Sequence, residues 1–173
     1  MLLGMSESAR VTTNAESVFR IDYPNSRPRK SRIIALDDHS LATLKELESH
    51  QWNDAHFLRY IERKAVSSSL PMQSFDAVLE DGDGNQRGLV EEIEDADVIV
   101  MVITAGTDAA AAETIANASF VRNRLTTGLV LNTGDVSSDS LARTLTAMRP
   151  FAAMLVVSSG AEYIDAMLTA LRA

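Results

Sequence analysis

The feature that most limits how this chain can fold is the run from Val98 to Ile103, in which every residue is β-branched or methionine. A strand with one wet face alternates apolar and polar side chains, whereas this run has no polar position. It is therefore expected to lie inside a parallel sheet, buried on both faces. Five other short, mainly apolar runs are strand candidates, at residues 33–36, 56–61, 75–79, 128–131 and 153–157.

Helical patterns separate these strand candidates. Leu41, Leu44 and Leu47 repeat at the spacing of one helix face, with Asp38 or Ser40 as the expected cap. Further helices are expected at residues 89–94, from Thr107 or Asp108 to about 124, at 139–148 and from about 161 to 171. Such alternation predicts right-handed βαβ crossovers. The expected fold is a three-layer α/β domain, Rossmann-like or flavodoxin-like, with an open, mostly parallel sheet of five or six strands and helices on both faces.

The length of 173 residues and the hydrophobic content of 46% suit one domain with a substantial core. Residues 1–30 are polar and end in a stretch that contains Pro24 and Pro28, so we expect an N-terminal arm or linker, followed by a single α/β domain over residues 31–173. The chain has no cysteine, no apolar run long enough to span a membrane and no signal-peptide pattern. We therefore expect a cytoplasmic protein without a membrane partner.

The net charge of −8 is concentrated in residues 76–97, which hold nine acidic residues against the single base Arg87. The remainder of the chain is close to neutral. Nucleic acid is therefore not an expected partner, because phosphate backbones are bound by clustered lysine and arginine. The one basic cluster is expected to be a solvated charge run before the first strand, with contact to a phosphate or an acidic partner as the alternative; it consists of Arg27, Arg29, Lys30 and Arg32.

The loops that follow the expected strands carry many polar residues. In open α/β sheets, ligands bind outside the carboxyl ends of the strands, where the strand order reverses. The candidate ligand-binding residues are Asp37, Asp38, His39, Thr104, Gly106, Thr107, Asp108, Asn132 and Ser158. The alternative is that these residue types only form turns and helix caps. If the binding hypothesis holds, Asp37 and Asp108 should face a common hollow that takes a small-molecule ligand.

Three carboxylates suggest a metal in this crevice. Asp37, Asp38 and Asp81 would converge if the first and third strands were neighbours. A group of hard oxygen ligands suits Mg²⁺, with water and a phosphoryl group completing the octahedron. Mg²⁺ is therefore the cofactor that this arrangement would favour, although the sequence does not identify a cofactor.

Two segments of the first half resemble response-regulator receiver domains. Residues 34–41 (Ile-Ala-Leu-Asp-Asp-His-Ser-Leu) are similar to the opening of that family, and residues 75–81 (Phe-Asp-Ala-Val-Leu-Glu-Asp) are similar to its third strand, which ends in the phosphorylated aspartate. The resemblance implies Mg²⁺ ligands at Asp37 and Asp38, a phosphoryl acceptor at Asp81 and a switch hydroxyl at Thr104. The family's lysine after the fifth strand is absent, so conventional phosphotransfer is not expected.

The second half resembles a different family. Residues 97–106 and 125–130 are similar to the nucleotide domain of bacterial tubulin-like cell-division GTPases. That family binds triphosphate with consecutive glycines, where this chain has Thr107-Asp108-Ala109-Ala110. Because side chains and a carboxylate at this turn oppose a close triphosphate, GTP hydrolysis is not expected.

Three functional hypotheses follow. The first is a regulatory or noncatalytic domain that binds a small anionic or metal-bridged ligand at the strand ends. The second is an enzyme or enzyme subunit that uses an acidic site at Asp37 and Asp38, with His39 as a candidate acid or base. The third is an oligomerising scaffold, in which the last helix supplies an apolar face made of Ile164, Met167, Leu168 and Leu171.

Overall fold

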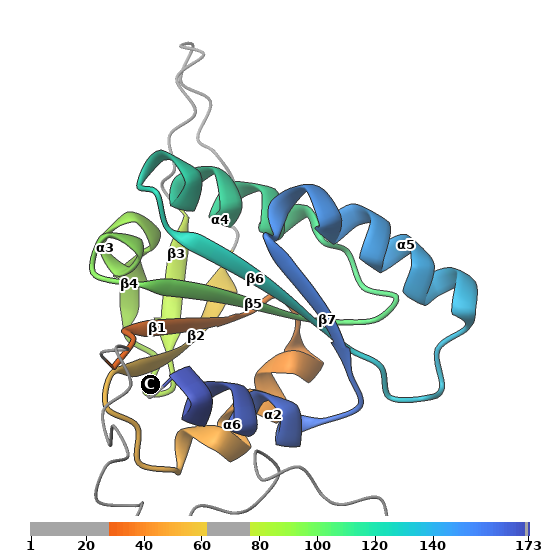
Figure 1. The fold of residues 1–173 in the computed structure, drawn as a ribbon, viewed down its shortest axis with the longest axis horizontal. Helices are drawn as coiled ribbons and strands as arrows, with labels where there is room; N and C mark the ends of the chain where they lie inside the picture. Colours follow the sequence, from red (N-terminus) through yellow and green to blue (C-terminus); the bar gives the residue numbers. More distant parts are fainter. Residues whose placement is uncertain (1–27, 62–76, 172) are drawn as a thin grey trace, which may run out of the picture.

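The computed structural model describes residues 28–61, 77–171 and 173, and its strands form one sheet (Figure 1). The strands are β1 (Ser31–Ala35), β2 (Ala55–Ile61), β3 (Val78–Asp81), β4 (Gln86–Gly88), β5 (Val98–Thr104), β6 (Leu125–Leu131) and β7 (Met154–Ser158). The helices are α2 (Asp38–Glu48), α3 (Leu89–Glu94), α4 (Ala110–Val121), α5 (Ser138–Met148) and α6 (Ala161–Leu171), with a 3₁₀ turn at Arg149–Phe151. Almost all of the expected arm over residues 1–30 lies outside the described residues and stays a prediction.

The strand order across the seven-stranded sheet is β4-β3-β2-β1-β5-β6-β7. Five adjacent strands of this sheet are parallel to one another, namely β2, β1, β5, β6 and β7. β3 pairs antiparallel with β2, and β4 pairs antiparallel with β3. Numbered along the chain, the parallel strands have the order 2-1-3-4-5, which is the order of flavodoxin-like folds. The expected α/β class is confirmed, and the sheet has one strand more than the upper expected number.

The two antiparallel strands correct the expectation for residues 75–79. The described strand there is β3, which pairs antiparallel with β2 and is followed by β4 in a tight hairpin. Asp81 accepts hydrogen bonds from the backbone N–H groups of Asp83 and Asn85, which closes the turn. A reversal this short can join only antiparallel strands. The third parallel strand is therefore β5, and the neighbours of β1 are β2 and β5.

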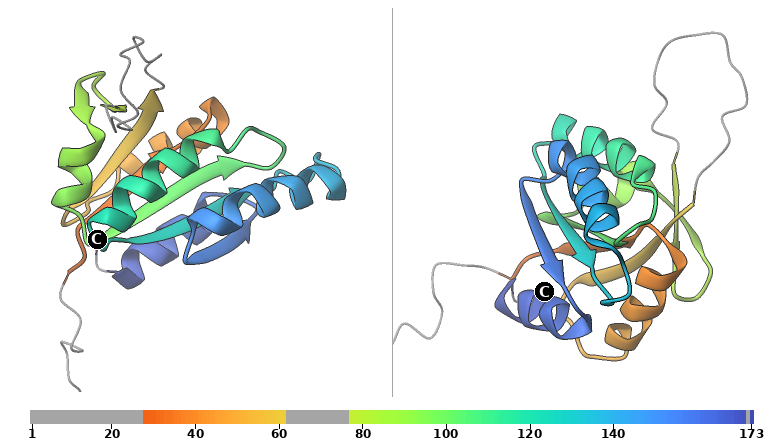
Figure 2. Two further views of the ribbon diagram at one scale, coloured as in Figure 1. Left: turned by 90° about the horizontal axis from the view of Figure 1, so that it is seen from above. Right: turned by 90° about the vertical axis from the view of Figure 1, so that its right-hand side faces the viewer.

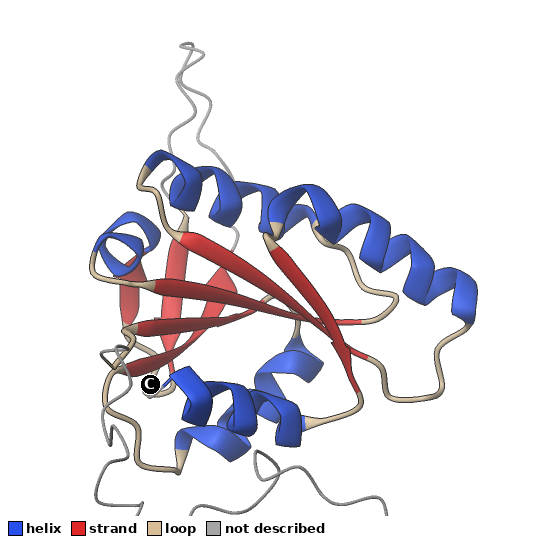
Figure 3. Ribbon diagram, viewed as in Figure 1, coloured by secondary structure: helices blue, strands red, loops and turns tan. Residues whose placement is uncertain are grey.

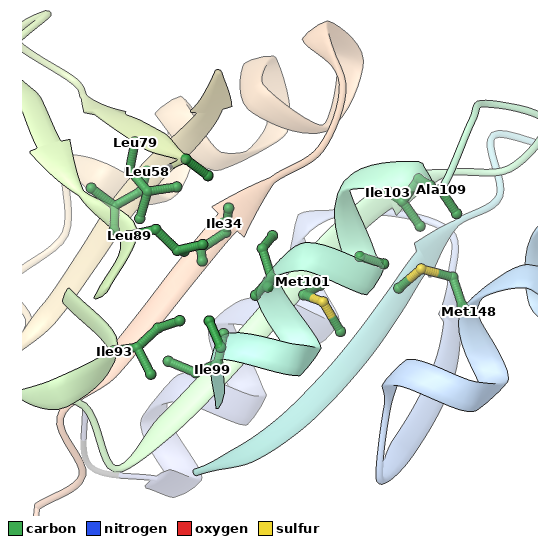
Figure 4. Close-up of a cluster of buried hydrophobic side chains, with 14 of the residues drawn as sticks. Ile34, Leu58, Leu79, Leu89, Ile93, Ile99, Met101, Ile103, Ala109 and Met148 are labelled. Atoms are coloured by element: carbon green, nitrogen blue, oxygen red, sulfur yellow. The ribbon is translucent and has the colours of Figure 1, made fainter. Parts of the chain in front are cut away.

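Helices cover both faces of the sheet, as expected (Figures 2 and 3). The core on one face joins the sheet to α3, α4 and α5, and it includes Ile34, Met101, Ile103 and Met148 (Figure 4). The core on the other face joins the sheet to α2 and α6. All seven residues of β5 are buried, so the prediction of a doubly buried strand from Val98 to Ile103 is confirmed.

The last helix belongs to this second core. Ile164 and Leu168 are fully buried against the sheet, and Met167 and Leu171 pack at the margin of the same cluster. This apolar face is therefore used within the chain and does not supply the surface that the scaffold hypothesis assigned to it. None of the described helices is long and apolar enough to cross a membrane.

Arg32 corrects the expectation of a solvated basic run. This residue lies on β1, and 1% of its side chain is exposed. Its guanidinium forms ion pairs with Glu92 at 2.7 Å, Asp95 at 3.1 Å and Asp54 at 3.2 Å. The contact to Glu92 is an ion pair without hydrogen-bond alignment at Nε. A charge that points into the protein needs such partners, and the acidic stretch after β4 supplies two of them.

Candidate functional site

The strand order reverses between β1 and β5, and Asp37 lies at this point. It follows β1 and is the N-cap of α2, where its Oδ1 accepts hydrogen bonds from the backbone N–H groups of His39 (3.0 Å) and Ser40 (2.9 Å). The Ser40 hydroxyl in turn accepts from the Asp37 N–H at 3.3 Å, which completes a capping box. The helix cap is thus one residue before Asp38, the earlier of the two expected positions.

The Asp37 carboxylate also binds the end of β5. The Thr104 N–H donates to Oδ2 at 2.7 Å and the Thr104 hydroxyl donates to Oδ1 at 2.8 Å, while the Thr107 hydroxyl makes a longer contact to Oδ2 at 3.4 Å. Burial alone would raise the pKa of Asp37, but the hydrogen bonds from the backbone and side chains of Ser40 and Thr104 outweigh it and hold the pKa below its ordinary value. Asp37 is therefore an ionised structural link between two loops.

These contacts determine what Asp37 can bind. A carboxylate has about four lone-pair positions, and four donors from His39, Ser40 and Thr104 already bind this one. The negative charge also occupies the N-terminus of α2, where an external anion would otherwise be stabilised. Asp37 is therefore a poor ligand for a metal ion, and its negative charge competes with a phosphate for the N-terminus of α2.

Asp38 and His39 lie on the exposed first turn of α2. The Asp38 carboxylate pairs with the Arg59 guanidinium of β2 at 2.6 Å, and the Asp38 side chain is 84% exposed. His39 is exposed as well. Both side chains are therefore on the surface beside the switch point, whereas Asp37 is partly buried in it.

Asp81 is held in the β3–β4 hairpin, away from Asp37 and Asp38. It lies opposite Leu58 in the middle of β2, and its carboxylate accepts hydrogen bonds from Asn85 and Arg87. The N–H of Asn85 is the main influence that keeps the pKa of Asp81 below its ordinary value. The expected three-carboxylate site is wrong in its geometry, because β3 adjoins β2 instead of β1. Within residues 28–61 and 77–171, no group of three acidic or histidine side chains is arranged to hold a metal ion.

A hollow of about 350 Å³ lies at the end of β5, between the β5–α4 turn and α5. Three of the expected ligand-binding residues line it, namely Gly106, Thr107 and Asp108. The opposite wall consists of Ser140, Arg143, Thr144 and Ala147 from α5. This wall is not predictable from the sequence, because polar residues on the outer face of a helix have the same pattern whether or not they border a hollow.

Two contacts hold the β5–α4 turn in place. Gly106 has a φ of +92°, and its N–H donates to the Thr144 hydroxyl of α5 at 2.9 Å. The Thr107 hydroxyl donates to the Thr104 carbonyl at 2.7 Å. The N-cap of α4 is Ala109, so the expectation of a cap at Thr107 or Asp108 is wrong, although the Asp108 carboxylate accepts a hydrogen bond from the Ala110 N–H at 3.1 Å.

Arg143 is the cationic side chain on the wall of the hollow. Its Nε donates to the Asp139 carbonyl at 3.3 Å and its Nη2 donates to the Ser140 hydroxyl at 3.2 Å. A guanidinium has five N–H donors, so these two contacts within α5 leave three donors for an additional acceptor. The hollow therefore combines hydroxyl groups with one carboxylate and one incompletely paired guanidinium.

The remaining candidate residues serve their own turns. Asn132 accepts a hydrogen bond from the Gly134 N–H through its side-chain oxygen, and the Ser158 hydroxyl donates to the Gly160 carbonyl. Neither residue lines the hollow at the end of β5. Asp37 contacts the Thr107 hydroxyl, and Asp108 is the next residue along the chain. Only Asp108 lines the hollow, so the expectation that both carboxylates face a common hollow is wrong for Asp37.

Comparison with known proteins adds a likeness of fold. No protein-family model matches the chain, and no curated protein matches it in sequence. Among solved structures, the chain is similar to the apo form of a flavoprotein from Lactobacillus acidophilus NCFM, determined by NMR. The TM-score is 0.47 at 9% sequence identity, and the match covers 81% of this chain and 97% of the other. The likeness assigns no ligand to this chain.

Proposed function

We propose that this chain is a noncatalytic, regulatory binding domain that takes a small anionic ligand in the hollow between the β5–α4 turn and α5. The observation that carries the proposal is the Arg143 guanidinium, which borders the hollow and uses only two of its donors on its own helix. Arginine binds carboxylate and phosphate groups through paired N–H donors, and the pairing is stronger than a neutral hydrogen bond.

The other wall limits the charge and the size of the ligand. The first turn of α4 presents backbone N–H groups, which favour a negative charge, but the Asp108 carboxylate already accepts a hydrogen bond from one of them, the N–H of Ala110. The negative charge of the Asp108 carboxylate in the hollow opposes a di- or triphosphate. A volume of about 350 Å³ is at the small end of ligand pockets, which span roughly 300–1,000 Å³. The favoured class is a small carboxylate or monophosphate.

The state of Asp37 supports a binding role over a catalytic one. A general base needs an accessible lone pair and a pKa near the working pH, whereas four hydrogen bonds already bind the Asp37 carboxylate and its pKa is lowered. The same contacts favour an unbridged anion over a metal-bridged one. No contact within the described part of the chain favours the alternative of an enzyme that uses Asp37 and Asp38.

The test is an NMR titration of the ¹⁵N-labelled protein with sodium succinate and with inorganic phosphate at constant ionic strength. The expected result is a saturable shift of the amide signals of Gly106, Ala110 and Ser140 with at least one of the two anions. Arg143→Gln should weaken binding by at least about tenfold, since a charge-assisted pair contributes ~1.5–3 kcal/mol and ~1.4 kcal/mol corresponds to a factor of ten. Arg149→Gln is the matched control, because Arg149 is also exposed but does not line the hollow. Equal weakening by both variants, or no saturable shift, would contradict the proposal.

A further inference from the structure

Among the parallel strands, β7 is the one with no buried residue. It is the last strand of the sheet, and among the described strands its only neighbour is β6 (Figure 2). None of its five residues is buried, although four are apolar. Met154 is 50% exposed and Val157 is 43% exposed. Parallel strands are normally buried on both faces, so the described chain alone leaves this strand incomplete.

The opposite edge strand, β4, has features that protect it from pairing with another chain. β4 has three residues, and two of them are the exposed polar residues Gln86 and Arg87. Short edge strands and charged side chains are the usual protection against pairing between chains. β7 has five residues without charge or proline, so it lacks this protection.

The apolar surface continues from β7 onto β6. Leu125 is 64% exposed, and it lies on the same face as Met154, because Met154 is paired with Thr127, two residues after Leu125. Scattered single apolar residues need no explanation, but apolar side chains beside an open strand edge mark a pairing surface.

We infer that β7 pairs with β7 of a second copy of this chain, so that two sheets join edge to edge in a two-fold dimer. Two copies of one strand related by a two-fold axis must run antiparallel, which is a permitted sheet pairing. With the axis at Val156, each Val157 lies opposite Leu155 of the partner chain, and each Met154 lies opposite Ser158 of the partner chain. No like charges meet in this arrangement, and β-branched and aliphatic side chains face each other across the joint.

The first test measures the oligomeric state of the full chain by sedimentation velocity over a range of concentrations. The expected wild-type result is a reversible monomer–dimer equilibrium. Val157→Lys brings two lysines next to the axis, and it should raise the dimer dissociation constant at least about tenfold, since unfavourable pairs across strands cost ~1 kcal/mol each and the axis doubles the effect. Gln86→Lys is the matched control on the other edge and should leave the equilibrium unchanged. A circular dichroism spectrum equal to that of the wild type shows that each variant is folded.

The second test uses the absence of cysteine in the chain. Val156→Cys should form a disulfide-linked dimer under mild oxidation, because the axis brings the two cysteines opposite each other, whereas Gln86→Cys should stay monomeric under the same conditions. A wild-type chain that is monomeric at all concentrations would overturn the inference. Dimerisation only after removal of residues 1–27 would also overturn it, and would assign the β7 edge to that segment instead.

Discussion

The carboxylate of Asp37 is hydrogen-bonded to both the backbone N–H and the hydroxyl of Thr104, at 2.7 and 2.8 Å. One side chain thereby joins the end of β1 to the end of β5 and caps α2 as well. It occupies the point where the strand order reverses, which is the usual ligand position in this class of sheet. The Asp37 carboxylate thus occupies that position, and the hollow in which we propose a ligand lies beside it, between the β5–α4 turn and α5.

Replacing Asp37 should destabilise the protein strongly. Asp37→Ala removes a helix cap and leaves the Thr104 N–H and hydroxyl without an acceptor, so the free energy of unfolding should fall by about 3 kcal/mol. Urea denaturation followed by circular dichroism measures this change. Asp38→Ala is the control: its pair with Arg59 is exposed, and the loss should stay within about 0.5 kcal/mol. Similar losses in the two variants would show that Asp37 does not link the two strand ends.

The same residue predicts a pH dependence. The pKa of Asp37 is lower in the folded chain than the ordinary aspartate value of 3.8. The unfolded chain then binds the proton more readily, so this carboxylate stabilises the fold above about pH 4, and the contribution is lost as pH falls through the lower folded pKa. The difference in unfolding free energy between the wild type and Asp37→Asn should be constant from about pH 7 to about pH 5 and should shrink below about pH 4. A difference that grows on acidification would contradict the assignment.

Gly106 offers a test of the turn that borders the hollow. Its φ of +92° is unfavourable for any residue with a Cβ, while the atoms nearest to an added methyl group, on Val136 and Ser140, would be at ordinary contact distances of 3.6 and 3.8 Å. Gly106→Ala should therefore lose about 1–2 kcal/mol of stability through backbone strain alone. Gly160→Ala is the control, because that glycine has no positive φ and open space around it. Thermal unfolding of both variants measures the difference, which reports the backbone strain at Gly106.

The buried guanidinium of Arg32 predicts a non-additive pair. Arg32→Met leaves the buried carboxylate of Glu92 without its closest cation, and the free energy of unfolding should fall by about 3–5 kcal/mol. Glu92→Gln in the same chain removes this buried negative charge, for which Arg87 at 3.3 Å is then the remaining arginine partner, so the double variant should recover part of the loss. A double-mutant cycle by urea denaturation measures the coupling. Additive effects would show that the two charges do not depend on each other.

Residue types by themselves located six of the seven described strands and the five described helices, whereas β4 was not expected. The run from Val98 to Ile103 has one stable environment, the doubly covered middle of a parallel sheet, and β5 occupies it. The polar residues after β5 were also placed correctly at the strand ends, because a chain that leaves a buried strand must satisfy its backbone in a turn. Gly106, Thr107 and Asp108 line the hollow for this reason.

The tertiary structure alone decided which of these residues meet. Asp81 was expected to close a metal site with Asp37, but the direction and the neighbour of a strand depend on its connections, and β3 pairs with β2 in the opposite direction. Arg32 has the sequence context of a surface charge, yet the fold brings Asp95, 63 residues away, beside it. Arg143 had no local signal, since only packing of α5 beside the β5–α4 turn makes it part of a wall. Local residue patterns report burial and turns, whereas a site requires contacts between segments whose distance in the sequence carries no information about their distance in space.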